Sequence, residues 1–330
     1  MQEFLFYKKV ISPFILTSKV RCRKYSLLLE RKIVDFASDT AFNKIPRKLK
    51  EHYNINVPIS SCQKIAKNRA KKIYETFPDK ISDKKENCII AECDGVMVPI
   101  VKISDEKKDK RKTRKSGWKE VKLTLAKKKG SIDKIYLATI GSREKAGDLL
   151  ERCVKRIGLG KSTKIHFVGD GAPWIAEQVE RIFGTQATYL IDFYHLSEYL
   201  SEASEVCSEE KNVWRKVYQK KMKENKLQDV IKELEKKLPK DKDEKIKKCL
   251  RYINNRIDKF DYKNAIKNKL PIGSGEIESG NRSIVQKRLK IPGAWWLKET
   301  VEYMLSLICL IENGDWEEYW EREYEKIKAA

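Results

Sequence analysis

The feature that most constrains the fold is a change in the spacing of apolar residues near residue 88. Between Ser26 and about Phe77, apolar residues recur at the three- and four-residue spacing of amphipathic helices. After residue 88 the pattern first becomes strand-like and then alternates between strand and helix. The strand-like runs are Cys88–Val101, Trp118–Ala126, Ile132–Ile140, Lys164–Val168 and Thr188–Phe193, and the helical runs between the later strands are Arg143–Ile157 and Pro173–Phe183. This order predicts a mixed α/β sheet that is covered by helices.

The same order of elements, three strands and then helix, strand, helix, strand, is typical of a ribonuclease-H-like α/β domain, although other mixed sheets share it. We expect four segments. Residues 1–87 form an all-α, DNA-binding region; residues 88–195 form the first part of the catalytic domain; residues 196–270 are a Lys/Glu-rich helical insertion; and residues 271–330 contribute the closing helix and the C-terminal helices.

The charge balance points to a polyanionic partner. The chain of 330 residues has 71 Lys and Arg against 48 Asp and Glu, which gives a formal net charge of +23. Such an excess favours nucleic acid, with an anionic membrane surface a weaker alternative. The longest apolar run, Tyr303–Ile311, has nine residues, whereas a membrane span needs about 20. We therefore expect no transmembrane helix and a cytoplasmic location.

The N-terminal helical region contains a pattern typical of a helix-turn-helix. Ile45–Tyr53 is expected to be one helix, Asn54–Pro58 the turn, and Ser60–Phe77 the second helix, opened by a capping box from Ser60 to Gln63. Cations on the second helix would contact DNA as a recognition helix does; they are Lys64, Lys67, Arg69, Lys71 and Lys72. The alternative is a helical hairpin with a solvated basic face. The basic segment Lys107–Lys115 is either a phosphate contact or a solvated loop.

Two aspartates lie within or at the end of a predicted strand, and each is followed directly by glycine. Asp94 lies in the first strand, in Ala-Glu-Cys-Asp-Gly-Val, and Asp170 ends a later strand, in Phe-Val-Gly-Asp-Gly-Ala. Ligands gather at the carboxyl ends of parallel strands, and glycine lets a bulky partner approach. Two aspartates with a third carboxylate nearby are the ligands that a pair of Mg²⁺ ions requires for in-line displacement at phosphorus. The chemistry expected is phosphodiester cleavage or transfer.

The third carboxylate is expected from Gly-Ser-Gly-Glu-Ile-Glu-Ser-Gly-Asn-Arg, which offers Glu276 and Glu278. On a helix these two side chains point about 200° apart, so one of them faces the site. Glu278 shares its face with Val285 and Leu289, and we therefore choose Glu278 as the inward residue. Glu276 is better explained as an acidic residue that is favoured near a helix N-terminus.

These residues carry a resemblance to a known family. The motifs Asp-Gly-Val at 94, Gly-Asp-Gly-Ala-Pro-Trp at 169–174, Asp-Phe-Tyr-His at 192–195 and Gly-Ser-Gly-Glu-Ile-Glu at 273–278 resemble those of the DDE transposases of bacterial insertion sequences. The most similar branch is the one related to Mutator-like elements, which has an Asp/Cys-x-x-His signature. Cys22-Arg-Lys-Tyr-Ser26 and the stretch at His52 also resemble that branch, so the resemblance covers nearly the whole chain.

The resemblance implies a DDE-type transposase with a ribonuclease-H-like domain, in which Asp94, Asp170 and Glu278 hold two Mg²⁺ ions, with Mn²⁺ able to substitute. Water would cleave the ends of the element, and the freed 3′-hydroxyl would attack target DNA. Asp192 and His195 match the branch signature as auxiliary residues; alternatively, they are a helix cap and a packed ring. Trp295 and Trp296 either stack on an unpaired base or pack in the core.

The partners implied are double-stranded DNA, as terminal repeats and as target, and at least a second copy of the chain on DNA, in the nucleoid. Two other functions remain open. One is a domesticated relic that binds DNA without cutting it. The other is a ribonuclease-H-like nuclease acting on RNA or branched DNA, against which the helix-turn-helix and the long insertion argue.

Overall fold

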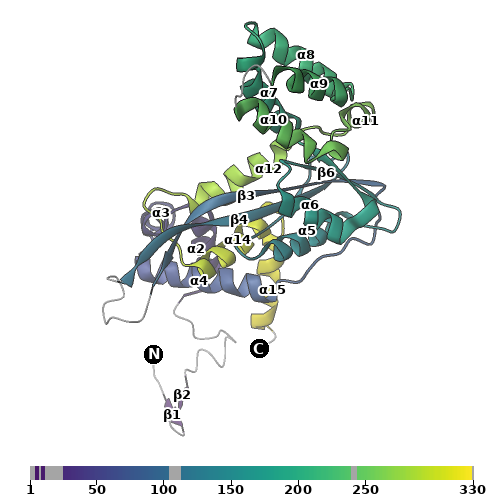
Figure 1. Cartoon of the computed structure of the whole chain (residues 1–330). Coiled ribbons are helices and arrows are strands. Elements are labelled where there is room, and N and C mark those ends of the chain that lie inside the picture. Colours follow the sequence, from purple (N-terminus) through teal and green to yellow (C-terminus); the bar gives the residue numbers. More distant parts are fainter. Residues whose placement is uncertain (1–3, 7–8, 12–24, 104–112, 239–243, 329–330) are drawn as a thin grey trace. The chain divides into compact units, whose positions relative to one another are not determined.

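The structure is a computed structural model that describes residues 4–6, 9–11, 25–103, 113–238 and 244–328. The chain divides into two compact units (Figure 1). One comprises residues 79–290, and the other combines residues 1–78 with residues 291–330. Residues 291–330, for which the sequence predicts C-terminal helices after the closing helix of the sheet, belong to the same compact unit as residues 1–78. This association links segments far apart in the chain, which local patterns do not reveal.

A five-stranded mixed sheet forms the centre of the unit at residues 79–290. Its strands are β3 (Cys88–Lys102), β4 (Lys115–Lys128), β5 (Ile135–Thr139), β6 (Lys164–Gly169) and β7 (Ala187–Ile191). Their order is β5-β4-β3-β6-β7. The pairs β3–β4 and β4–β5 are antiparallel, whereas β6 runs parallel to both β3 and β7. All five strands therefore form where the apolar pattern predicted them.

Two helices cover one face of the sheet. They are α5 (Arg143–Ile157) and α6 (Pro173–Phe183), and the short 3₁₀ turn η3 (Gly184–Gln186) follows α6. Both helices match the predicted ranges; Ser142 caps the start of α5 by accepting from the N–H of Lys145, and Gly158 ends it with a φ of 128°. Ile89, Ala91 and Cys93 of β3 share a buried cluster with these helices. Because side chains alternate along a strand, Glu92 and Asp94 face the other side.

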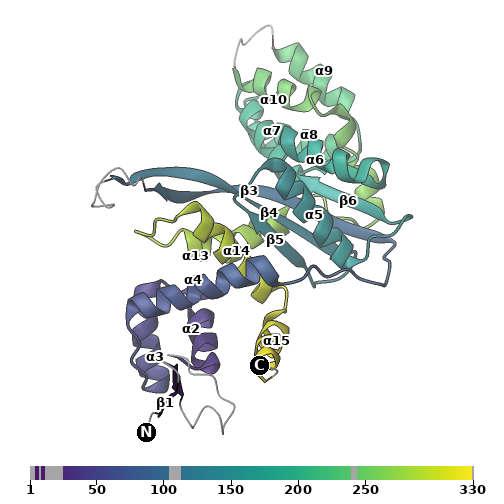
Figure 2. The same cartoon turned by 90° about the horizontal axis from the view of Figure 1, so that it is seen from below.

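The helical insertion follows β7 directly. It consists of α7 (Phe193–Cys207), α8 (Lys211–Lys223), α9 (Leu227–Lys237), α10 (Glu244–Asn254), the 3₁₀ turn η4 (Ile257–Lys259) and α11 (Tyr262–Lys267). These helices form a cluster of their own in Figure 2. Their buried core also includes Leu190 and Ile191 of β7, so the insertion is packed onto the end of the sheet.

The chain returns to the sheet as one continuous helix. Its parts are α12 (Gly275–Gly280), a π-helical stretch η5 (Asn281–Gln286) and α13 (Lys287–Leu289). Ile277, Ile284, Val285 and Leu289 are buried on its inner side. Gly280 permits close packing, because a Cβ there would lie 2.7 Å from the Tyr136 ring and 3.1 Å from Leu123. The closing helix that the sequence predicted within residues 271–330 is therefore present, with Ser274 as its N-cap.

The other unit is helical. Its helices are α2 (Leu27–Asp39), α3 (Ile45–Tyr53), α4 (Ile59–Thr76), α14 (Lys298–Glu312) and α15 (Trp316–Lys328), with the 3₁₀ turn η1 (Phe42–Lys44) before α3. Ile33, Ile45, Leu49, Cys62 and Ala66 form the core that α2, α3 and α4 share. The short strands β1 (Phe4–Phe6) and β2 (Lys9–Ile11) pair antiparallel.

The start of α4 corrects one prediction. The capping box from Ser60 to Gln63 does not form, because the helix begins at Ile59 with Pro58 as its cap and without a side-chain cap bond. Proline has no side-chain acceptor, so the first N–H groups of α4 receive no side-chain cap from Pro58.

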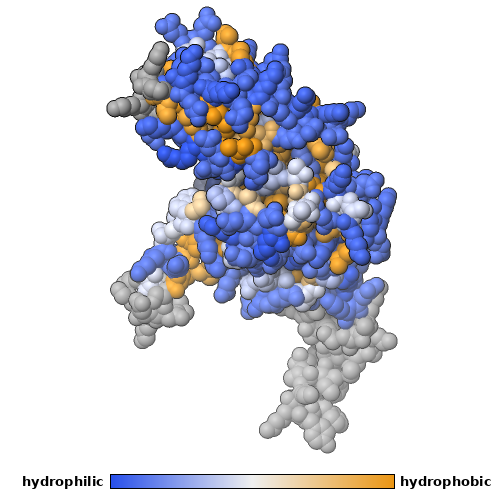
Figure 3. Space-filling model, turned by 45° about the vertical axis from the view of Figure 1, so that its right-hand side comes forward, coloured by the Kyte–Doolittle hydropathy of each residue, from blue (hydrophilic) through white to orange (hydrophobic). Residues whose placement is uncertain are grey.

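The surface agrees with the charged composition. On the face in Figure 3, hydrophilic side chains cover most of the area. Within the part of the chain that the structure describes, no helix has the length and hydropathy that crossing a membrane requires. The Lys107–Lys115 segment falls mostly outside the described residues.

Candidate active site

Asp94 lies in the middle of β3, the central strand of the sheet, on the face opposite α5 and α6. Its Oδ1 accepts a hydrogen bond of 2.7 Å from the N–H of Gly95, and its Oδ2 accepts one of 2.7 Å from Nδ2 of Asn281. The carboxylate is therefore fixed by its own strand and by the helix that returns to the sheet. This placement agrees with the sequence argument, which put Asp94 inside the first strand.

Asp170 follows the last residue of β6, which is the parallel neighbour of β3. Its Oδ1 accepts a hydrogen bond of 2.8 Å from the N–H of Ala172, and Gly171 between them has a φ of 84°. An L side chain rarely adopts that backbone conformation, so glycine is required for this turn. The parallel register, in which Glu92 pairs with Val168, thus places Asp94 in the middle of β3 level with Asp170 just beyond the end of β6.

The two glutamates of α12 separate as their spacing requires. Glu276 forms ion pairs with Lys127 and, at 3.7 Å, with Lys134, which lie on the β4–β5 side. Glu278 is solvent-exposed, so it does not pack on the sheet as the face analysis had placed it. It lies one helical turn before Asn281, the residue that holds Asp94, and its charge acts on Asp94. Glu276 is therefore paired with lysines, whereas the charge of Glu278 acts on Asp94.

Electrostatics couples the three carboxylates. Burial raises the pKa of Asp94, and the negative charges of Asp170 and Glu278 raise it further. The N–H of Gly95 and the nearby His195 act in the opposite direction. Like charges raise the pKa of a carboxyl when they lie close enough to destabilise its ionised form. Asp94, Asp170 and Glu278, from three different elements, therefore share one electrostatic environment, and we call them the carboxylate triad.

Asp192 connects α7 to the segment before α12. It is fully buried; its Oδ1 caps α7 by accepting from the N–H groups of Tyr194 and His195, at 2.6 and 3.4 Å. Its Oδ2 accepts from the N–H of Ser274, at 2.9 Å, and from the Ser274 hydroxyl. The structure therefore shows Asp192 as a helix cap, which was one of the two alternatives. Asp192 also holds the segment at Ser274, which leads into the helix that contains Glu278. His195 lies on the first turn of α7, and its charge lowers the pKa of Asp94.

Glu92 is a buried carboxyl that the sequence analysis missed. It lies two residues before Asp94, on the same face of β3, and its Oε2 accepts a hydrogen bond of 2.8 Å from the N–H of Ile277. Burial raises its pKa to about 8, against the Ile277 hydrogen bond, and the charges of Glu276 and Asp192 add to the rise. The sequence contained a signal for this position, because residues two apart on a strand lie on the same face and Glu92 is two residues before Asp94. Glu92 ties the first turn of α12 to the central strand.

The donor set suits a hard cation, although its side chains do not form a closed ligand sphere. Carboxylate and carboxamide oxygens are the ligands that Mg²⁺ and Mn²⁺ take. The Oδ1 of Asn281 is buried and has no hydrogen-bond partner in the structure, and it belongs to the same carboxamide that holds Asp94. Among the described residues, however, no three His, Cys, Asp or Glu side chains are grouped closely enough to bind a metal ion. The oxygen donors are thus of the type that Mg²⁺ and Mn²⁺ bind, but the carboxylate side chains would have to move closer together to bind an ion.

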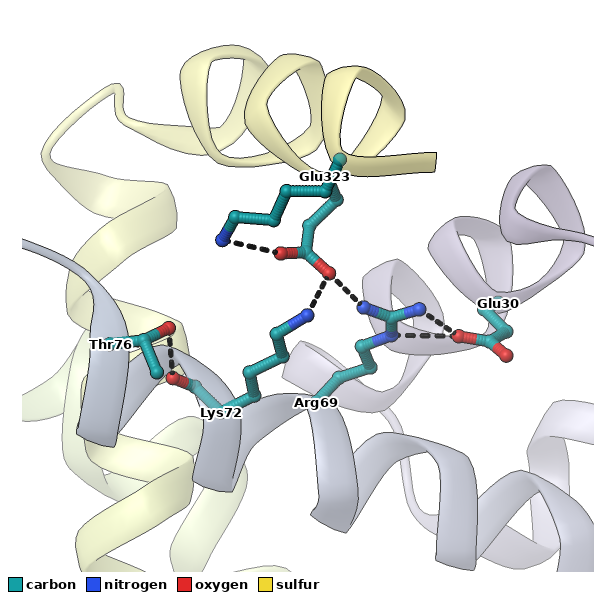
Figure 4. A network of polar contacts seen from close by, with 6 residues as sticks. Glu30, Arg69, Lys72, Thr76 and Glu323 are labelled. Atoms are coloured by element: carbon teal, nitrogen blue, oxygen red, sulfur yellow. Dashed lines mark hydrogen bonds and ion pairs between the residues drawn. The ribbon is translucent and has the colours of Figure 1, made fainter. Parts of the chain in front are cut away.

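The predicted DNA-contacting cations of α4 fall into two sets. Arg69 is buried and its guanidinium is paired with Glu30 of α2 and Glu323 of α15, while Lys72 is paired with Glu323 (Figure 4). Lys326 also contacts Glu323, at 3.2 Å. Arg69 and Lys72 therefore join helices within their own unit.

Lys64 and Lys71 remain on the solvent side of α4, seven residues apart, with exposed Asn68 between them. Lys67 is half-buried, and burial lowers its pKa. Trp296 is buried and its ring lies 6.0 Å from the ring of Phe42, so the core-packing alternative describes it. Its neighbour Trp295 is exposed.

Comparison with known proteins places the chain in a family. A family model described as "Uncharacterised protein family (UPF0236)" matches residues 61–325, which is most of the chain. The chain belongs to this family. Two UPF0236 proteins of Caldanaerobacter subterraneus subsp. tengcongensis are each 27% identical to it over 157 residues, which is 47% of this chain. The match spans 32% of one relative and 30% of the other, so the chain covers about a third of the length of the curated relatives it matches.

Proposed function

We propose that this UPF0236 chain is a metal-dependent transposase of the DDE type. It would cleave phosphodiester bonds at the ends of a mobile element and join them to target DNA. The observation that carries the proposal is the placement of Asp94 on β3 level with Asp170, which follows the parallel strand β6, while Glu278 lies on the helix that returns to the sheet. Burial raises the pKa of Asp94, and the charges of Asp170 and Glu278 add to the rise. Carboxyl groups with shifted pKa values are common at functional sites.

The topology supports a ribonuclease-H-like assignment of the sheet. Three antiparallel strands, β3 to β5, are followed by two strands, β6 and β7, that extend the other side of β3 in parallel. The triad lies on β3, after β6, and on the helix that covers the free face. The helical insertion enters after β7, between the second and third carboxylates, in the order that the sequence motifs required.

In this proposal Asp94, Asp170 and Glu278 hold divalent cations, and Asn281 offers a further oxygen. When bound, such cations activate an attacking hydroxyl group and stabilise the leaving oxygen at phosphorus. The chain's own residues supply the orientation. Gly95 and Asn281 fix the carboxylate of Asp94, Asn281 by a hydrogen bond of 2.7 Å. Asp192, through Ser274, fixes the loop that leads to Glu278.

DNA binding is proposed for the helical unit that contains α2, α3 and α4, in a helix-turn-helix arrangement. The exposed side of α4 presents Lys64 and Lys71, while its buried side packs on α2 and α3. The net charge of +23 supports contact with phosphates along the remaining surface. Cleavage of two element ends together requires at least two copies of the chain on DNA.

The test is cleavage of a supercoiled plasmid that carries the DNA flanking the gene, with Mg²⁺. The wild type should nick or join at the ends of the element, whereas Asp170→Ala and Glu278→Gln should be inactive. Glu276→Gln is the matched control, because Glu276 lies on the same helix but is paired with Lys127. Equal activity of Glu278→Gln and the wild type would refute the triad.

A second candidate function is DNA binding without cleavage. The finding that favours it is that the described His, Cys, Asp and Glu side chains form no group ready to bind a metal ion. This alternative predicts that the wild type binds the element ends but never cuts them, and that Asp94→Ala leaves binding unchanged. Preference for RNA–DNA hybrids or branched DNA over linear ends would instead indicate a nuclease.

A further inference from the structure

The helical insertion touches the backbone of the turn that carries Asp170. The hydroxyl of Tyr252, on α10, donates a hydrogen bond of 2.8 Å to the main-chain oxygen of Asp170. Arg256, just after α10, donates two hydrogen bonds to the main-chain oxygen of Gly171, from Nε at 3.0 Å and from Nη2 at 2.7 Å. Two consecutive carbonyl groups of the turn are therefore held by side chains of the insertion.

The turn has little freedom on its other side. The N–H of Gly171 donates to the hydroxyl of Tyr189 on β7, at 3.2 Å, and the N–H of Ala172 donates to the Asp170 carboxylate. A Cβ on Gly171 would lie 2.3 Å from Nε of Arg256. The guanidinium is thus packed directly onto the turn. The contacts of Tyr252 and Tyr189 restrain the peptide plane between Asp170 and Gly171, and those of Arg256 restrain the next plane, between Gly171 and Ala172. The backbone on the C-terminal side of Asp170 is therefore held in place.

Tyr252 and Arg256 are themselves held rigidly. The ring of Tyr252 stacks on the ring of Tyr199, with centroids 4.0 Å apart and planes 17° apart. The guanidinium of Arg256 lies 4.2 Å from the centre of the Tyr252 ring, and its Nη1 donates to the main-chain oxygen of Tyr252 at 2.9 Å. Burial raises the pKa of Tyr252, so its hydroxyl keeps the proton that it donates. A stack of three side chains, Tyr199 of α7, Tyr252 of α10 and Arg256 just after α10, therefore ends on the Asp170 turn.

We propose that Tyr252 and Arg256 are positioning residues, through which the helical insertion sets the orientation of Asp170 within the carboxylate triad. This inference rests on the proposed function, because it assigns Asp170 a role in binding a divalent cation. It makes the insertion part of the active site's support instead of an independent appendage. Any movement of α10 relative to the sheet would move the turn, and activity would follow the packing of the insertion.

The test compares Tyr252→Phe and Arg256→Gln with Tyr262→Phe. Tyr262 is the matched control, because it also lies buried in the insertion but its hydroxyl has no hydrogen-bond partner in the structure. Amide hydrogen exchange of the peptide around residues 169–175 is measured without DNA or metal. Loss of one hydrogen bond should raise its exchange rate roughly five- to ten-fold in Tyr252→Phe. Tyr262→Phe should leave it unchanged.

Activity supplies the second readout. The Mg²⁺ concentration that gives half-maximal cleavage should rise in Tyr252→Phe and Arg256→Gln, while DNA affinity stays near that of the wild type. Arg256→Lys should recover part of the effect, because it keeps the charge and one donor. Unchanged exchange and unchanged Mg²⁺ dependence in Tyr252→Phe would overturn the inference. A wild type that does not cut DNA would overturn the proposed function alone, and the exchange comparison would still decide whether the insertion holds the turn.

Discussion

Replacement of Arg69 by methionine tests whether this cation acts in the interior of its unit or on its surface. The guanidinium pairs with the carboxylates of Glu30 and Glu323, whose side chains are 17% and 5% exposed. Methionine keeps much of the side-chain volume but removes the charge, so two shielded carboxylates lose a partner. Breaking a buried ion pair on one side costs about 3–5 kcal/mol.

The expected magnitude lies at the lower end of that range. Lys72, whose side chain is 39% exposed, still pairs with Glu323 after the substitution. Glu30 loses both of the hydrogen bonds that Arg69 donates to it. We therefore expect Arg69→Met to lower the free energy of unfolding by about 3 kcal/mol. Lys71→Met is the control, because its pair with Glu75 is half-exposed and contributes about 0.3–0.5 kcal/mol.

Urea denaturation measures the free energy of unfolding. Hydrogen exchange of peptides from α4 and α15 then reports on this unit separately from the sheet. Arg69→Met should increase exchange in both helices, and Lys71→Met should not. An Arg69→Met variant that is within 1 kcal/mol of Lys71→Met would contradict the reasoning; a loss of DNA affinity without loss of stability would return Arg69 to the DNA-contacting set.

Three further predictions follow from other contacts. In EDTA, Glu92→Gln should gain stability over the wild type by about 1.4 kcal/mol per pH unit between pH 5 and 8. The reason is that the folded pKa of about 8 lies above the unfolded value, so the wild type loses stability as pH rises; a pH-independent difference in denaturation midpoints would contradict this. Ser274→Ala should cost about 1.5–3 kcal/mol, because it removes a hydroxyl donor to buried Asp192, and calorimetric melting checks it. Lys64→Gln and Lys71→Gln should each lower the slope of log affinity against log salt by about one, and unchanged slopes in DNA-binding titrations would exclude contact with phosphates.

Local patterns located most of the secondary structure. The predicted ranges of α3, α5 and α6 agree with the structure. These segments have strong periodicity and clear boundaries, such as Ser142 before α5 and Pro173 at the start of α6. At α4 the local rule failed, because the helix begins at Ile59, one residue before Ser60, and Ser60 therefore has no capping role.

The burial of Arg69 could have been predicted from the apolar pattern of α4. Cys62, Ala66, Ala70 and Ile73 form the buried stripe of α4, and Arg69 falls on the same stripe. A cation on an apolar stripe predicts an internal carboxylate partner. Which carboxylate it meets was not readable, since Glu323 lies 254 residues away along the chain.

The candidate site shows the same division. Asp94 and Asp170 were found because strand order and glycine neighbours are local signals. Helix geometry chose Glu278 over Glu276 as the inward residue, but in the structure Glu278 is solvent-exposed and Glu276 is paired with Lys127, so the choice of Glu278 stays a prediction. Contacts made by Tyr252 and Arg256 had no local signal, because they depend on how the insertion folds back onto β6.

The most direct test of the carboxylate triad is calorimetric titration of the protein with Mn²⁺ in the absence of DNA. The wild type should bind Mn²⁺ with saturable heat, Glu276→Gln should bind it equally well, and Asp94→Asn and Glu278→Gln should each lose most of the affinity. Binding by Asp94→Asn that equals the wild type, or no binding by the wild type, would contradict the account that Asp94, Asp170 and Glu278 form a cation site.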